Sequence, residues 1–177
     1  MKKAFTLLEL VFAIVVIGIL AATIIPSTNT NSSAEAATQL ASHIRYTQHL
    51  AMMDDKYRAS STWFRDRWQI RFDGNKYSLA HDNNTKFAKD PQSAKELKAI
   101  DLEAKYSVEL EFTGSCSANA ILSFDYLGRP LLGSLSADTL PYPQNRIMTT
   151  ACNIKLTSGS ESSIITITPE TGYTKIQ

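Results

Sequence analysis

The sequence predicts an α+β protein, in which a long N-terminal α-helix is followed by an antiparallel β-sheet domain. An apolar run over 5–25 opens the chain, and a second helical pattern follows over about 34–54. Short alternating segments separated by turn residues fill 63–177, as is typical of antiparallel strands. With 177 residues, the chain has room for one folded domain and an N-terminal appendage.

The bulk composition argues against several functional classes. The formal net charge is only +1 and 44% of the residues are hydrophobic, so neither general attraction to nucleic acid nor disorder is expected. The sequence has no phosphate-binding glycine loop, nucleophile elbow or HExxH motif. His43 and His49 are six apart and do not share a helical face. We therefore expect no catalytic residue, no cofactor and no metal site.

The first helix, predicted over 5–25, is long enough to cross a membrane. About 20 helical residues cover the roughly 30 Å hydrocarbon core of a bilayer. Lys2 and Lys3 precede the run, which by the positive-inside rule places the N-terminus in the cytoplasm and the C-terminal domain outside it. The polar side chains within the run are Thr6, Glu9 and Thr23. Glu9 is the unusual one, because a carboxylate inside a bilayer costs about 2.5 kcal/mol or more at the centre.

Three interpretations of this segment compete. A secretory signal peptide would be cut at a small-residue site such as Ala34-Glu35-Ala36, but its apolar region spans only ~7–15 residues. A plain membrane anchor gives Glu9 no purpose. The third interpretation is that the carboxylate is functional, as ionisable groups inside membranes generally are.

The stretch KAFTLLELVFAIVVIGILAATIIP resembles the N-terminus of a type IV prepilin, which supports the third interpretation. The family pattern is a short basic leader ending in a small residue, then Phe-Thr-Leu-x-Glu-Leu and an apolar helix. The resemblance implies that residues 1–4 are a leader, cut between Ala4 and Phe5 by a prepilin peptidase that then methylates the Phe5 amine. Ala4 stands where the family usually has glycine.

The resemblance also assigns a role to the acid and implies partners. Glu9 would be the fifth mature residue and would meet the N-terminal amine of a neighbouring subunit during filament assembly. Other pilins or pseudopilins, the peptidase and an inner-membrane assembly platform would be its partners. The chain would cross the bacterial inner membrane once, with 34–177 as a periplasmic domain of pilin-like fold.

The remaining elements follow from local patterns. Pro26, where many pilins carry a proline, lacks a backbone donor and begins a break or linker over 26–33. Ser32-x-x-Glu35 resembles a capping box that restarts the helix. Strand patterns are expected at 68–72 and 76–79 as a hairpin, 108–112, 121–124, 153–156 paired with 163–168, and 173–176. Residues 81–99 are expected to form a surface loop with a short helix at 93–98.

The second half resembles one group within the family. ILSFDYLGRPLL, then NIKL and SSIITITPETGYTKI, are similar to the minor pseudopilin H group, the GspH/FimT type. That group tends to show a strand, Phe-Asp-x-x-Gly-Arg-Pro, another strand and a closing strand–Gly–strand hairpin. The matching positions here are Phe124, Asp125, Gly128, Arg129, Pro130 and Gly172.

Two further features carry expectations. Cys116 and Cys152 lie in the part expected to be exported, where an oxidising compartment favours a structural disulfide over two separate buried thiols. A basic, aromatic stretch contains Arg58, Arg65, Arg67, Trp68 and Arg71. Acidic residues interrupt this stretch, so we expect a solvated sheet face with Arg67 and Arg71 on one side, and DNA binding as the alternative.

The resemblance thus implies a structural subunit without catalytic activity, a minor pseudopilin or pilin of a type II secretion or type IV pilus filament. A minor pilin that binds DNA for uptake, or acts as an adhesin, is the alternative. A secreted enzyme behind an ordinary signal peptide is the third class.

Overall fold

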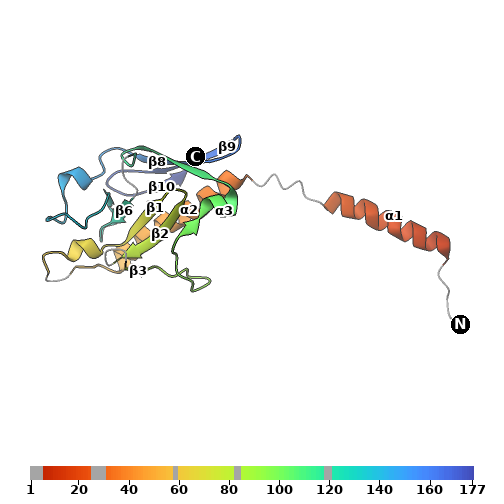
Figure 1. The fold of residues 1–177 in the computed structure, drawn as a ribbon, viewed down its shortest axis with the longest axis horizontal. Coiled ribbons are helices and arrows are strands. Elements are labelled where there is room, and N and C mark those ends of the chain that lie inside the picture. The colour runs from red at the N-terminus through yellow and green to blue at the C-terminus, as the bar shows by residue number, and fades with distance from the viewer. Residues whose placement is uncertain (1–5, 25–30, 58–59, 82–84, 118–120) are drawn as a thin grey trace. The chain divides into compact units, whose positions relative to one another are not determined.

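A computed structural model describes residues 6–24, 31–57, 60–81, 85–117 and 121–177 (Figure 1). The chain forms two compact units, Met1–Thr30 and Asn31–Gln177. The first contains helix α1, Leu7–Ile24. The second contains every other element.

Helix α2, Ser32–Met53, opens the second unit. The Asn31 side-chain oxygen accepts a hydrogen bond from the Ala34 amide at 3.0 Å, and so caps the helix. The predicted capping box at Ser32 and Glu35 is therefore wrong, because asparagine, an equally strong capping residue, lies one position earlier. Small and aliphatic side chains form the buried face of α2: Ala36, Ala37, Leu40, Ala41, Ile44 and Ala51.

Two antiparallel sheets accompany α2 in this unit. The first sheet has the order β3-β2-β1-β6-β7, with β4 also paired to β2. Its strands are β1 Gln69–Asp73, β2 Lys76–His81, β3 Lys86–Phe87, β4 Ile100–Asp101, β6 Ile121–Phe124 and β7 Pro130–Leu132. The second sheet has the order β10-β9-β8-β5. Its strands are β5 Glu109–Gly114, β8 Cys152–Ser158, β9 Glu161–Ile167 and β10 Thr174–Ile176.

The predicted α+β class is confirmed, and so are the main strand pairings. β1 and β2 form the expected hairpin, with Phe72 opposite Tyr77, and β8 pairs with β9 over their whole length. α2 packs on β8, β9 and β10, and also touches β1 and β6. One buried cluster, running in sequence from Ala36 to Ile167, joins the helix to both sheets. The second unit therefore has a hydrophobic core of its own.

The expected helix at 93–98 is wrong. Ala94 takes a positive φ of 56°, which ends any right-handed helix there, and Lys89 instead forms a β-bridge with Glu96. The short helix lies later, as α3 Leu102–Tyr106, and the Asp101 side chain caps it by accepting from the Ala104 amide at 2.8 Å. Two 3₁₀ turns, Trp63–Asp66 and Gln144–Arg146, complete the unit.

Candidate assembly segment and surface sites

The start of α1 is organised by a threonine and the unusual glutamate. The Glu9 amide donates to the Thr6 hydroxyl oxygen at 3.3 Å and to the Thr6 carbonyl at 3.1 Å. Thr6 therefore caps the helix from the position just before it, and Glu9 lies in the first turn, where an acid is favoured by the helix dipole. Sequence reasoning missed this cap, although Thr-x-x-Glu is a recognised capping signal.

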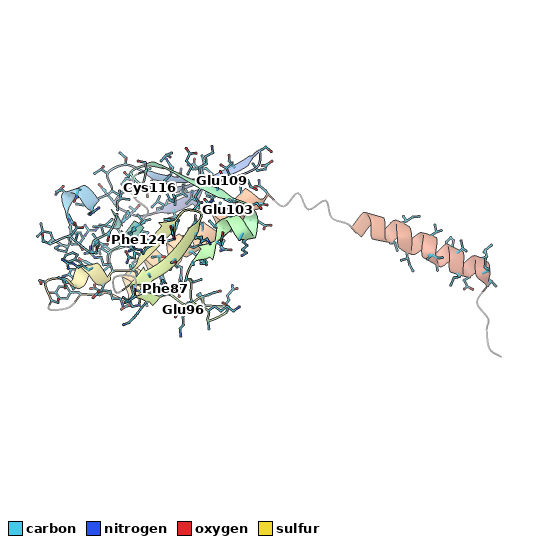
Figure 2. All side chains as sticks on the ribbon, viewed as in Figure 1. Phe87, Glu96, Glu103, Glu109, Cys116 and Phe124 are labelled. Carbon is cyan, nitrogen blue, oxygen red and sulfur yellow. A yellow bond between two sulfur atoms is a disulfide. The ribbon has the colours of Figure 1, made fainter. Side chains whose placement is uncertain are left out.

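The described side chains of α1 are not covered by other residues of their unit. Every described side chain in the helix is exposed, with Leu7 and Leu8 at 80% and Phe12 at 69%, and Figure 2 shows them projecting outward along its length. An apolar surface of this extent marks a site that contacts another protein or a membrane. Within the described ranges, no helix combines the length and apolar character needed to cross a membrane.

Several predicted positions lie outside the described residues. These are the cleavage and methylation positions Ala4 and Phe5, the predicted helix break at Pro26, and Arg58 of the basic stretch. Their roles stay predictions.

The Phe124–Pro130 segment forms a tight turn built on a buried aspartate. Asp125 is 1% exposed, and one of its carboxylate oxygens accepts from the Leu127 and Arg129 amides at 3.0 and 2.8 Å. The other oxygen accepts from Nε of the Arg129 guanidinium at 2.7 Å. These bonds explain why Asp and Arg occur at this spacing, and the carboxylate serves to close the turn between β6 and β7.

A single α2 side chain connects this turn to the closing hairpin. The Gln48 amide nitrogen donates to the carbonyls of Gly128 and Thr171 at 2.8 and 2.9 Å. Gly172 has a φ of +64°, and a Cβ placed there would lie 2.6 Å from the Gly128 oxygen. The predicted residues Gly128 and Gly172 thus meet at one packed point where side chains do not fit.

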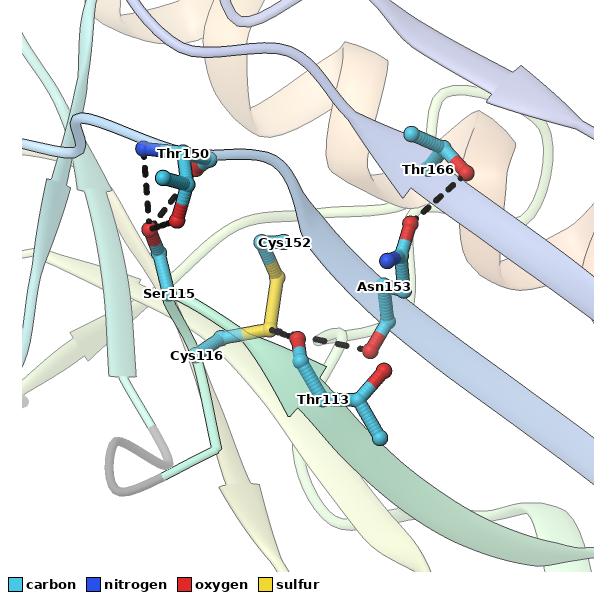
Figure 3. Close-up of a disulfide and its surroundings, with 7 residues drawn as sticks. All are labelled: Thr113, Ser115, Cys116, Thr150, Cys152, Asn153 and Thr166. Atoms are coloured by element: carbon cyan, nitrogen blue, oxygen red, sulfur yellow. Dashed lines mark hydrogen bonds between the residues drawn. A yellow bond between two sulfur atoms is a disulfide. The ribbon is translucent and has the colours of Figure 1, made fainter.

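Cys116 and Cys152 form the expected disulfide (Figure 3). Both residues are buried, and the bond joins the segment after β5 to the start of β8. Nearby, the Ser115 hydroxyl donates to the Thr150 carbonyl at 2.7 Å, so a hydrogen bond and the disulfide both connect these two segments. For a sequence separation of 36 between the cysteines, the chain-entropy model gives a stabilisation of about 4 kcal/mol.

The basic stretch does not form a continuous positive surface. The Arg65 guanidinium donates to the Asp138 carbonyl at 2.9 Å, and that of Arg67 to the Pro141 carbonyl at 2.7 Å. Arg67 is only 4% exposed, so the expectation that it shares a solvent face with Arg71 is wrong. The physical reason is that Arg67 lies before β1, where its guanidinium holds the loop that contains Pro141.

Arg67 is held in an aromatic stack. Its guanidinium carbon lies 4.9 Å from the Trp63 ring centroid and 4.5 Å from that of Tyr142, while Arg129 lies 5.1 Å from the latter ring. Burial lowers the pKa of Arg67, an effect that the charge of Asp125 opposes. The stack therefore fastens the loop before β8 to the β6–β7 turn.

A hydrogen-bond chain ends at His43. Gln39 accepts from the Lys105 amine at 2.6 Å and the Tyr106 hydroxyl at 2.8 Å, and its amide nitrogen donates to the Tyr77 hydroxyl oxygen at 3.0 Å. The Tyr77 hydroxyl oxygen in turn lies 2.7 Å from Nδ1 of His43, and the tautomer of the ring decides which of the two donates.

Burial lowers the pKa of His43, partly against the charge of Asp90, and Lys105 lowers it further. Burial also raises the pKa of the Tyr77 hydroxyl, which keeps its proton. Among the described residues, no group of three or more histidine, cysteine, aspartate or glutamate side chains is arranged to hold a metal ion.

Comparison with known proteins gives one match. Residues 1–25 match the family described as the prokaryotic N-terminal methylation motif. No curated protein and no solved structure matches the chain. The chain therefore carries the N-terminal methylation motif of prokaryotic prepilin-like proteins, and its helix followed by antiparallel sheets is consistent with a pilin-like α+β fold.

Proposed function

We propose that this chain is a minor pseudopilin or pilin, a structural subunit of a type II secretion or type IV pilus filament. The observation that carries the proposal is the match of residues 1–25 to the methylation motif, on a helix whose described apolar side chains are all exposed. In this proposal the chain is cut between Ala4 and Phe5, methylated on the Phe5 amine and held in the inner membrane before assembly.

Glu9 supplies the physical driving force for ordered assembly. An unpaired carboxylate in hydrocarbon is penalised, and pairing with a cationic amine offsets much of that penalty. A subunit whose Glu9 meets the Phe5 amine of its neighbour is therefore favoured over one out of register. Other filament subunits, the prepilin peptidase and the assembly platform are the partners, and the second unit lies in the periplasm.

Within the family we place the chain in the minor pseudopilin H group. The proposal rests on the sequence resemblance described above, whose matching residues form the turn built on Asp125 and Arg129 and the packed contact between Gly128 and Gly172. These features are structural contacts within the second unit.

The test is a fractionation of cells that express the tagged full chain with and without a prepilin peptidase. With the peptidase, the chain is expected in sheared filaments together with the other subunits. Without it, the chain should stay in the inner-membrane fraction with its leader. A chain that appears as a soluble periplasmic protein in both strains would contradict the proposal.

A further inference from the structure

A cleft of about 410 Å³ lies on the outer face of the first sheet, over β1, β2 and β3. The strand register defines that face. Phe72 and Tyr77 are paired and buried, so Arg71 and Ser78, the adjacent pair, point to the other side. Phe87, labelled in Figure 2, joins this face by pairing with Ala80 of β2.

Two cations of the cleft have no acidic partner among the described residues. Arg71 is half-buried, yet its guanidinium forms no hydrogen bond or ion pair there. The Lys98 amine lies 4.8 Å from the Phe87 ring centroid, and no described carboxylate pairs with it. A guanidinium with unused donors is suited to a planar oxyanion, which it can bind through two parallel hydrogen bonds.

The lining of the cleft supplies another hydrogen-bond donor, the Ser78 hydroxyl. The Ser78 hydroxyl oxygen accepts from the Ala99 amide at 2.8 Å, which leaves its hydrogen available to a ligand. Ala99 has a φ of +49°, a left-handed conformation that costs a non-glycine residue about 1–2 kcal/mol. Backbone strain of this kind concentrates at functional sites.

The acidic residues at the rim limit how much negative charge can enter. Lys76 is already paired with Asp101 at 2.9 Å, and Asp73 also lines the cleft. The bond to Asp101 raises the pKa of Lys76, so that this amine stays charged and paired with Asp101. The unpaired positive charge of the cleft is therefore limited to Arg71 and Lys98, and the carboxylates of Asp73 and Asp101 lie at the rim.

We propose that this cleft binds a single carboxylate side chain, glutamate or aspartate, presented by a protein partner. Arg71 would bind the carboxylate through its guanidinium, Ser78 would donate to it, and Lys98 would add charge. The rim carboxylates disfavour a polyanion such as nucleic acid, which needs an extended positive track, but tolerate one inserted acid. The proposal concerns a different surface from α1 and holds whichever filament the chain serves.

The experiment uses residues 31–177, the unit that has its own core and disulfide, labelled for amide NMR. A short peptide with one glutamate among neutral residues is titrated at low salt, beside the same peptide with glutamine in place of the glutamate. We expect saturable shifts at Ser78 and Ala99 with the glutamate peptide alone. Arg71→Gln should weaken binding about tenfold, because it removes charge-assisted hydrogen bonds.

Lys155→Gln is the matched control, since it removes one positive charge of a half-buried residue from the second sheet. It should leave the affinity unchanged. The absence of saturable shifts, equal binding of the glutamine peptide or equal weakening by both variants would overturn the proposal. So would tighter binding of inorganic phosphate or a short single-stranded oligonucleotide to the same residues, which would identify a phosphate site.

Discussion

At the scale of single residues, Glu9 has one role that its backbone hydrogen bonds show and a second that we propose, and the two can be tested separately. Its amide completes the Thr6 cap, and its carboxylate lies in the first turn of an exposed apolar helix. The first role is local and concerns helix stability. The second, pairing with a neighbouring amine, is the one that the proposed assembly requires.

Glu9→Gln should still insert in the membrane but should enter filaments at least about tenfold less, because the amide keeps the shape and loses the charge that pairs with the amine. Glu9→Ala should behave the same way. Thr6→Ala is the control, since losing a cap costs only about 1 kcal/mol of helix stability. Quantification of the tagged subunit in sheared filaments measures this, and normal incorporation of Glu9→Gln would exclude the charge-pairing role.

His43 predicts a pH dependence of stability. Its pKa is lowered in the folded state, so below the ordinary value of about 6.5 the unfolded chain binds a proton that the folded chain does not. The free energy of unfolding should therefore fall as the pH drops below about 6.5, until the lowered pKa is reached. Urea unfolding of residues 31–177 at several pH values measures this, and His43→Gln should remove that part of the slope. An unchanged slope in the variant would contradict the lowered pKa of His43.

At the scale of elements, the contact between two glycine turns holds the closing hairpin against the β6–β7 turn. Gly172→Ala should destabilise the second unit by about 3 kcal/mol, because the new Cβ would meet the Gly128 oxygen and the Gln48 side chain in addition to the left-handed strain. Gly159→Ala has a similar φ of +58° but open space around it, and should cost only about 1 kcal/mol. Urea denaturation compares them, and equal losses would show that the packing has no separate effect.

The helices and strands could be predicted from the sequence more fully than the contacts between residues distant in sequence. The β1–β2 hairpin could be predicted because alternation and the Asp-Gly-Asn turn are local signals. The cap at Asn31 was missed because Ser32 offered a competing pattern one residue on. The burial of Arg67 could not be predicted, because its partners Pro141 and Tyr142 are distant in sequence and meet it only in the folded unit.

The candidate sites also differ in whether local sequence or only the folded structure reveals them. Glu9 was identified from sequence because an acid in an apolar run violates a simple energetic rule. The cleft at Arg71 was not, since it depends on Ser78, Phe87 and Lys98 coming together across strands and a loop. The roles of Asp125 and Gly172 needed the geometry to show that they serve turn closure and packing.

At the scale of the whole molecule, the two units differ in whether their apolar side chains are buried within the unit itself. The second has its own core, two sheets and a disulfide, while the first has an apolar helix whose described side chains are exposed. A chain built this way needs an external apolar environment for its first unit only. In the proposed function, the membrane would supply this apolar environment first, and the packed helices of a filament would supply it after assembly.

The mass of the mature full chain, isolated from cells with a prepilin peptidase, tests the central claim most directly. We expect loss of residues 1–4 and a gain of one methyl group on the Phe5 amine, located by fragmentation of the N-terminal peptide. A mature chain that begins near Ala36, or that retains Met1, would contradict the assignment as a prepilin-like subunit.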